Sequence, residues 1–395
     1  MIQSGTEILT FKDAVEQLLD LHELDVRNGL NERRARLCVL QAYRDIPFRT
    51  AWSYYYRQRL LQTVASQTSS TVTYDHTGGA YERVLTIAAG TWPSWAAYGR
   101  VIIDETHYEV EDRKSSTELT LTETSNPGAD VAAGTTYELY RSAYPLPANF
   151  RSLVSIWDVD EQRQLSVIEP AEQHKVLASY DEPSTPEWVA IRSTGEFYGG
   201  LCLHFSPPPS EAATYDMLYM ATPRPLTIDA YSAGTVAVTN GSTTVTGTNT
   251  VFPTSCVGSV IRFSTSSAPP TSLLGEIASD GGGADNPFAM QGVIKTRSSA
   301  TSLVLEEAAT VEIPSGSAYV ISDPLDIEPG AMYTAFMSHA EAEFSQRAGR
   351  EDATRRLALA RQRLLEAMEA DTRVENTGNP RSSYDPFTRT NLTSE

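Results

Sequence analysis

The nine residues Arg113-Lys-Ser-Ser-Thr-Glu-Leu-Thr-Leu121 return without a gap as Arg297-Ser-Ser-Ala-Thr-Ser-Leu-Val-Leu305. Both stretches pass from a polar turn into an alternation of apolar and polar residues, which is typical of a half-buried strand. Self-similarity between distant parts of a chain indicates that one supersecondary unit is used more than once. The two stretches therefore predict two copies of one β unit.

The residues around this pair repeat in the same order. In the first copy the anchors are Thr91, Gly99, Val101-Ile102, Gly134 and Tyr137, and in the second they are Thr250, Gly258, Val260-Ile261, Gly316 and Tyr319. The pattern predicts a β module at 66–142 and its repeat at 233–322, superposing Arg113 on Arg297 and Gly134 on Gly316. A stretch rich in Ser, Pro and Gly at 264–289 interrupts only the second copy, and it is typical of a surface loop.

Both chain ends carry helical periodicity. Thr10 with Asp13 forms a capping-box pattern before an apolar face, so a helix is expected at 10–22. Further helices are expected at 31–45 and at 331–370, with Gly349 as a point of kinking or division. The aromatic stretch 52–61 suits a helix or a strand equally.

These patterns predict an α+β fold, in which a helical bundle built from both chain ends carries two inserted β-rich modules, barrel-like or sandwich-like, and a central mixed region. The expected divisions follow the chain in six parts. They are the N-terminal helices (1–65), the first module (66–142), the central region (143–232), the second module with its loop insertion (233–322), the C-terminal helix (323–370) and the extended tail (371–395).

The negative charge is unevenly distributed. The chain of 395 residues has a formal net charge of −19, and residues 61–330 hold 32 acidic against 13 basic side chains. A nucleic-acid-binding protein needs clustered Lys and Arg to displace counterions, so this composition argues against that class. An acidic surface serves either solubility or repulsion of DNA that passes without binding.

Compartment signals are few. Cys38, Cys202 and Cys256 lie far apart without a CxxC motif and are expected to be buried free thiols. No secretory signal opens the sequence, and no apolar run reaches the length of a membrane span. We therefore expect a protein made in a reducing compartment that does not enter a membrane.

Catalytic and metal-binding patterns are also missing: the sequence holds no phosphate-binding glycine loop, GxSxG or HExxH motif. His204 is expected to be a sheet residue. Asp158, Asp160 and Glu161 suit a solvated strand end better than a Ca²⁺ site. Asp280-Gly-Gly-Gly-Ala-Asp285 suits a loop tip, and Trp92, Trp95 and Tyr98 suit a module core better than a sugar platform. We predict no enzyme activity, no cofactor and no metal.

Several stretches together resemble the head-to-tail adaptor, or head-completion, proteins of tailed bacteriophages. The stretches are Ala42–Pro47 with Trp52, Gly78-Gly79, Glu82-Arg83, Gly90–Pro93, Tyr144–Phe150, Pro186–Trp188, Leu203–Pro207, Tyr219 with Pro225-Leu226, and Ile321–Ile327. The likeness spans nearly the whole chain but contains no single diagnostic motif, and the second β module is less typical of simple adaptors.

The resemblance implies a structural virion protein. Such a protein would form a homo-oligomeric ring of about twelve copies, bind the portal protein above and a tail, nozzle or tail-terminator protein below, and line part of the DNA channel without binding DNA specifically. Tail fibres are a further possible partner. The expected location is the virion neck, after assembly in the host cytoplasm. A fibre-attachment or receptor-binding virion protein is the alternative, followed by a carbohydrate-active enzyme.

The polar tail 371–395 contains few apolar residues and cannot form a core. We predict that it extends along the portal or a neighbouring subunit, with Tyr384 and Phe387 as buried anchors and Arg381 and Arg389 paired with acidic groups.

Overall fold

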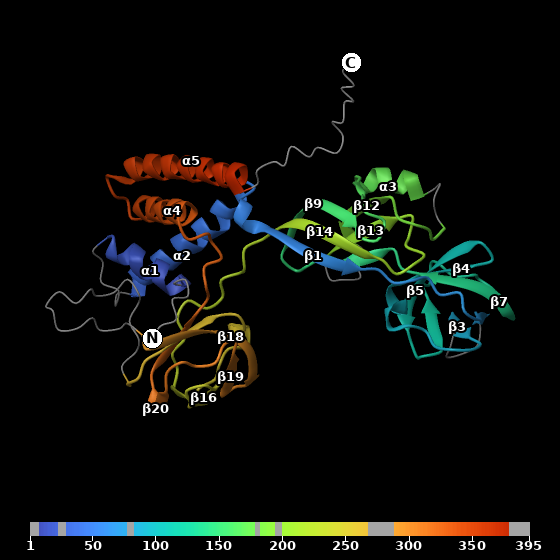
Figure 1. Cartoon of the computed structure of the whole chain (residues 1–395), viewed down its shortest axis with the longest axis horizontal. Coiled ribbons are helices and arrows are strands. Elements are labelled where there is room, and N and C mark those ends of the chain that lie inside the picture. Colours follow the sequence, from blue (N-terminus) through green and yellow to red (C-terminus); the bar gives the residue numbers. More distant parts are fainter. Residues whose placement is uncertain are drawn as a thin grey trace, which may run out of the picture. The chain divides into compact units, whose positions relative to one another are not determined.

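The computed structural model describes residues 8–22, 29–76, 83–177, 182–193, 200–267 and 288–378. Its contacts divide the chain into two compact units (Figure 1). The first unit joins Met1–Tyr55 to Pro223–Glu395, and the second is the continuous segment Tyr56–Thr222. The first unit therefore combines a segment from the N-terminal part of the chain with one from the C-terminal part.

The prediction of an α+β fold dominated by a helical bundle is wrong, because the structure is mostly β, with 38% strand against 26% helix. The described residues form five α-helices, which lie near the chain ends except for one short helix in the middle. Helical periodicity was a true local signal, but the alternating segments between the helices build most of the hydrogen-bonded architecture.

The first β module is a closed barrel within the second unit. Its strand order is β2-β3-β6-β5-β4-β7, and all neighbouring pairs are antiparallel. Inward-facing apolar residues fill it, among them Val72, Leu85, Val101 and Leu119, which are fully buried. The strands are β2 (Thr71–Asp75), β3 (Val84–Ile87), β4 (Arg100–Ile103), β5 (Thr106–Arg113), β6 (Glu118–Leu121) and β7 (Val131–Tyr140).

Two four-stranded sheets complete the second unit, in the orders β1-β14-β9-β10 and β11-β12-β13-β8. They share a core around Tyr144, Phe205 and Tyr215. The undecided stretch 52–61 ends as an edge strand. The elements are β1 (Tyr56–Gln62), β8 (Ala143–Pro145), β9 (Phe150–Asp158), β10 (Arg163–Gln164), β11 (Ser166–Val167), α3 (Pro170–Leu177), β12 (Trp188–Ser193), β13 (Leu201–Ser206) and β14 (Thr214–Ala221).

The second β module belongs to the first unit and forms one sheet in the order β20-β15-β16-β19-β18-β17-β21. Only Ala318 separates β20 from β21, so one residue joins the two ends of the sheet. The strands are β15 (Thr235–Val238), β16 (Thr244–Thr248), β17 (Val260–Phe263), β18 (Met290–Ser299), β19 (Ser302–Leu305), β20 (Ile313–Ser317) and β21 (Tyr319–Ser322).

The same pairing scheme occurs in both modules. Strands β2 to β6 of the first module pair with one another in the same way as β15 to β19 of the second. Strand β7 pairs with both β2 and β4, whereas in the second module β20 pairs with β15 and β21 pairs with β17. Arg113 lies opposite Leu119 and Arg297 lies opposite Leu303, and an irregularity interrupts each ladder two residues earlier. Register shifts also recur where β2 meets β7 and where β15 meets β20. Bulges are specific features of a strand. Because they recur at equivalent places, the two modules share the register of their strand pairs as well as the order of their strands.

One part of the sequence alignment is off by a single residue. The amide of Gly99 donates to Ala96, whereas the corresponding bond runs from Ser259 to Cys256. Gly99 therefore corresponds to Ser259 and not to Gly258. Trp92 of the first module corresponds to Phe252 of the second. The second module therefore has one extra residue directly before Phe252.

The helices of the first unit are α1 (Phe11–Asp20), α2 (Gly29–Asp45), α4 (Ala331–Arg347) and α5 (Ala353–Gly378). Helix α4 contacts the other three, and α4 and α5 lie side by side in Figure 1. The expected 331–370 helix is divided at Gly349, whose φ of +66° lies in the left-handed region. Helix α5 continues to Gly378, beyond the predicted end at 370.

Candidate functional site

The first turn of α1 is held by the predicted capping box. The Thr10 amide donates to Asp13 Oδ2 at 2.9 Å, and the Asp13 amide donates to Thr10 Oγ1 at 3.3 Å. Two backbone donors at the helix start thereby gain partners. The capping prediction is confirmed, and it also fixes where the Asp13 carboxylate points.

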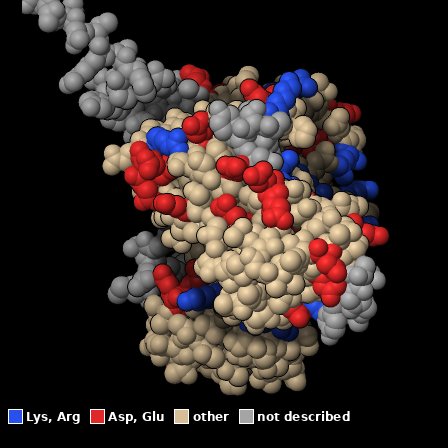
Figure 2. Space-filling model, turned by 90° about the vertical axis from the view of Figure 1, so that its right-hand side faces the viewer, with Lys and Arg blue, Asp and Glu red and all other residues tan. Residues whose placement is uncertain are grey.

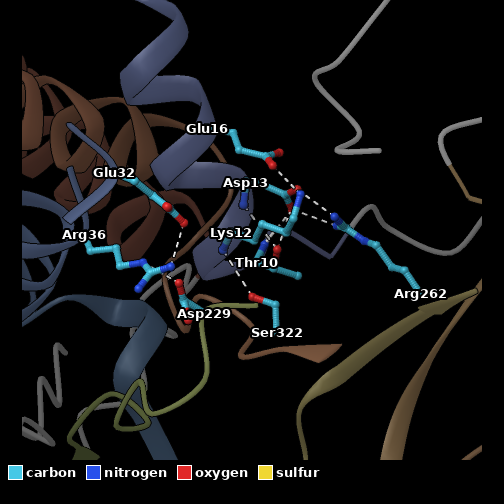
Figure 3. A network of polar contacts seen from close by, with 9 residues as sticks. All are labelled: Thr10, Lys12, Asp13, Glu16, Glu32, Arg36, Asp229, Arg262 and Ser322. Atoms are coloured by element: carbon cyan, nitrogen blue, oxygen red, sulfur yellow. Dashed lines mark hydrogen bonds and ion pairs between the residues drawn. The ribbon is translucent and has the colours of Figure 1, made fainter. Parts of the chain in front are cut away.

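That carboxylate forms a buried ion pair with Arg262 of β17 (Figure 3). The two guanidinium nitrogens lie 2.6 and 2.7 Å from the two carboxylate oxygens, in a bidentate arrangement. The side chains of Asp13 and Arg262 are 0% and 5% exposed. Arg262 also donates to the carbonyl oxygen of Ile8 at 3.0 Å and lies over the Phe288 ring. This pair fixes α1 to the second β module.

Burial by itself would raise the pKa of Asp13. The hydrogen bonds and positive charge of Arg262, helped by Thr10, outweigh burial and hold the pKa below its usual value. The carboxylate is therefore charged in the folded protein. A charge buried this deeply needs its partner, because an unpaired one would carry a large desolvation cost.

Asp323 forms a second buried link. Its carboxylate accepts hydrogen bonds from the Thr227 and Ile228 amides at 2.6 and 2.7 Å and from the Ser259 hydroxyl at 2.6 Å. Its own carbonyl oxygen accepts from the Phe11 amide at 2.8 Å. One residue thus joins the segment before the second module, the residue that directly precedes strand β17, and the start of α1.

The same region carries partly buried ion pairs. Arg36 of α2 binds Glu32 at 2.6 Å and also Asp229, and Lys12 binds Glu16 (Figure 3). The Lys12 amide donates to the Ser322 hydroxyl at 3.1 Å. Ion pairs near the surface contribute about 0–1 kcal/mol each, whereas removing one partner of a buried pair such as Asp13–Arg262 costs more.

Distant helices are tied together by polar and aromatic contacts. The Tyr333 hydroxyl donates to Gln17 Oε1 at 2.6 Å, and the His22 ring stacks on Phe344 with centroids 4.7 Å apart. Burial, followed by the nearby Arg350 and Arg356, lowers the pKa of His22 to about 4. His22 is therefore neutral near pH 7 and packs as an aromatic ring.

The helices also present an apolar surface. Leu21, the residue directly after α1, is 49% exposed, and Leu359 and Leu365 of α5 are 40% and 67% exposed. A hollow of about 340 Å³ lies beside Leu21 and Leu359, with Met337 and Tyr333 also in its wall. Exposed apolar groups grouped around a hollow are a feature of interaction surfaces.

The residues considered for metal or sugar binding are occupied in other ways. Asp158 Oδ1 accepts from the Asp160 and Glu161 amides, both at 3.1 Å, so its carboxylate caps its own turn. Within the described ranges, no group of three His, Cys, Asp or Glu side chains could hold a metal ion. Trp92 is buried and packs edge-on against Tyr137 in the barrel core. The loop 280–285 lies outside the described residues.

His204 is a buried residue of β13, as expected, with Nδ1 3.1 Å from Arg192. Burial, then Arg192 and Arg100, lower its pKa to about 3. The three cysteines are buried and free. No helix of the described residues is long and apolar enough to cross a membrane.

The four predicted tail residues, Arg381, Tyr384, Phe387 and Arg389, lie outside the described residues. Sequence reasoning missed the Asp13–Arg262 pair and the Asp323 link. A usable signal did exist, since Arg262 is the one charged residue in Val260-Ile-Arg-Phe263, a strand that is buried throughout. A charge inside a fully buried strand requires a partner elsewhere in the chain.

Comparison with known families gives one result. Residues 82–239 match the family model of the SU10 adaptor protein. The match begins just before β3 of the first barrel, crosses both central sheets and ends after β15. No curated protein matches the chain. The family match points to a structural adaptor protein and virion component, and it confirms the resemblance to the head-to-tail adaptors of tailed phages.

Proposed function

We propose that this chain is a subunit of the ring that joins the portal of a tailed-phage head to its tail. The family match carries the proposal. The exposed apolar surface of α1 and α5 supports it, because a ring needs a patch on each subunit that binds a different patch on its neighbour. In the virion the ring lies at the neck, after assembly of the subunits in the host cytoplasm.

The charge distribution supports a channel role. In Figure 2, Asp and Glu side chains lie mainly over the upper and middle parts of the face, with Lys and Arg between and beside them. The whole acidic excess of the chain falls within 61–330. A channel wall with this balance repels the phosphate backbone, so DNA passes without binding.

The tail completes the proposed attachment. Arg381, Tyr384, Phe387 and Arg389 contact the portal or a neighbouring subunit in this proposal. Any truncation should begin after Gly378, because Asp371 is buried and accepts a hydrogen bond from the Ser53 hydroxyl at 2.5 Å. A truncation at 371 would remove this contact and confuse attachment with folding.

The domain division is part of the same proposal. The segments 66–142 and 233–322 are two copies of one module, and the segments 1–65 and 323–370 supply the helices that carry the ring contacts. The matching strand pairings and register shifts support this duplication. Downstream, the ring binds a tail, nozzle or terminator protein and offers sites for fibres.

The decisive experiment adds purified protein to DNA-filled, portal-containing heads that lack it. Electron microscopy should show a ring of about twelve copies beneath the portal. The double variant Leu359→Glu/Leu365→Glu should keep its circular dichroism spectrum but fail to form the ring, because charges would replace the apolar contacts. Portals that stay bare with the unmodified protein would disprove the proposal.

A further inference from the structure

A groove beside strand β1 lies within the second unit. Strand β1 is at the edge of its sheet and pairs with β14 alone among the described strands. The groove has a volume of about 270 Å³ and runs between β1 and the segment that contains Tyr144, Pro145 and Pro147. An unpaired strand edge is a template for another strand, so natural proteins usually cover it.

The register shows which backbone groups face the groove. The Thr63 amide donates to Ala213 O at 2.9 Å, toward β14. Because hydrogen-bonded and non-hydrogen-bonded positions alternate in an antiparallel pair, the amides and carbonyls of Gln58, Leu60 and Gln62 point away from β14. The Val64 amide, next in this series, donates to the Tyr144 hydroxyl on the groove side at 3.1 Å.

The opposite wall cannot close on this edge. Proline has no amide hydrogen, and Pro145 and Pro147 both line that wall. Strand β8, which ends at Pro145, already pairs with β13 on its other side. The free groups of β1 therefore face a wall that does not complete the ladder.

The side chains of the groove define its occupant. The floor is apolar, with Met217 fully buried and Leu61 packed on the same core. The described residues that line it include two cations, Arg59 and Arg141, and no carboxylate. Arg59 is exposed and makes no ion pair with another described residue.

The second cation is held in place. Arg141 lies over the rings of Tyr98 and Tyr144, at 5.5 and 4.7 Å from their centroids, and its Nε donates to Ala143 O at 2.8 Å. A guanidinium positioned in this way loses little further entropy when it binds an anion. The groove therefore carries two cations, of which Arg141 is fixed by its contacts, at the border of a segment, 61–330, that is strongly acidic.

We propose that this groove binds an extended acidic segment of a partner protein by strand addition to β1. The partner's main chain pairs with Leu60 and Gln62, its apolar side chains lie on the floor, and its carboxylates bind Arg59 and Arg141. The occupant is not β1 of a second copy, since antiparallel self-pairing would bring two Arg59 side chains close together. The proposal concerns a single subunit and goes beyond the ring described above.

The test uses the full-length protein and two dye-labelled nine-residue peptides, one alternating valine with glutamate and the other valine with lysine. Fluorescence anisotropy should show binding of the glutamate peptide alone. Arg59→Glu should weaken it about tenfold, while Lys175→Glu, an equal charge change on exposed residue Lys175 of α3, should not. Hydrogen exchange at Leu60 and Gln62 should slow when the peptide binds.

Leu60→Pro tests the strand addition itself. It removes an amide that faces the groove and leaves the ladder to β14 intact, so peptide binding should be lost. Leu60→Thr keeps the amide and should bind. Equal binding of both peptides, no exchange protection in β1, or dimers of the unmodified protein that Leu60→Pro separates would each overturn the proposal. None of these results depends on whether rings form on heads.

Discussion

The two β modules share their pairing scheme but differ at one strand position that, in the second module, forms a buried link to helix α1. Strand β17 carries Arg262, which binds Asp13 of α1. The corresponding residue of β4, aligned through the equivalent backbone bonds, is Ile102. An apolar residue there cannot form such a link. The comparison teaches that a charged residue in place of an apolar one, in an otherwise equivalent strand, gives the second module a buried ion pair with a helix.

The two modules share a set of internal contacts around an arginine and an aromatic residue, and these contacts stabilise each module. Arg113 donates to the carbonyl of Trp92, and Arg297 donates to the carbonyl of Phe252. Each of these aromatic residues packs edge-on against a tyrosine, at 5.1 Å in the first module and 5.8 Å in the second. The same Ser–Thr hydrogen bond follows each arginine. These contacts lie inside the modules and do not depend on the anchor.

The largest effect is expected from Arg262→Ala. It leaves the Asp13 carboxylate buried without its partner, which costs about 3–5 kcal/mol. Hydrogen exchange in urea should show the loss in α1 and β17, while the first barrel keeps its protection. The control is Arg100→Ala, which breaks the exposed Arg100–Glu109 pair of the first barrel and should cost about 0–1 kcal/mol.

A second variant separates the charge from the shape. Asp13→Asn in the Arg262→Ala background removes the unpaired charge and should restore part of the lost stability, while keeping a side chain that can cap the helix. Equal protection of β17 in the unmodified protein and in Arg262→Ala would show that the pair does not anchor the module.

The sequence allowed the local features to be predicted but not the long-range ones. Thr10 and Asp13 predicted the helix start because a capping box spans only four residues. The stretches 113–121 and 297–305 predicted strands of a repeated β unit, because the alternation of apolar and polar residues is a local signal. The Asp13–Arg262 pair joins residues 249 positions apart, and neither residue alone indicates which partner it finds. The structure contradicts the predicted fold class, because the helical periodicity is confined to the chain ends and the many short strands between them make up more of the molecule.

A smaller effect, equal in the two modules, is expected from Arg113→Ala and Arg297→Ala. Each removes a charged donor from an aromatic residue's carbonyl, at a cost of about 1.5–3 kcal/mol. Urea unfolding monitored by exchange in β5 and β18 measures both. Lys295→Ala is the control, because Lys295 is exposed and its loss should fall within about 0.5 kcal/mol. A large effect in one module only would show that the arginines do not play equivalent parts.

The smallest effect is expected at the two glycines of the closing strands. Gly134 and Gly316 have φ values of +97° and +89°, and an added Cβ at either would meet no heavy atom within 4 Å. Steric crowding is therefore excluded, and Gly134→Ala and Gly316→Ala should each cost about 1 kcal/mol through backbone strain alone.

Gly29 of α2 also has open space around it but no left-handed φ. Gly29→Ala should accordingly be neutral or stabilising, because alanine restricts the unfolded chain and suits a helix. Thermal unfolding of the three variants compares them directly. Unequal losses at the two closing-strand glycines would mean that the modules share strand order but not the backbone conformation at the bend, which would narrow the likeness between them.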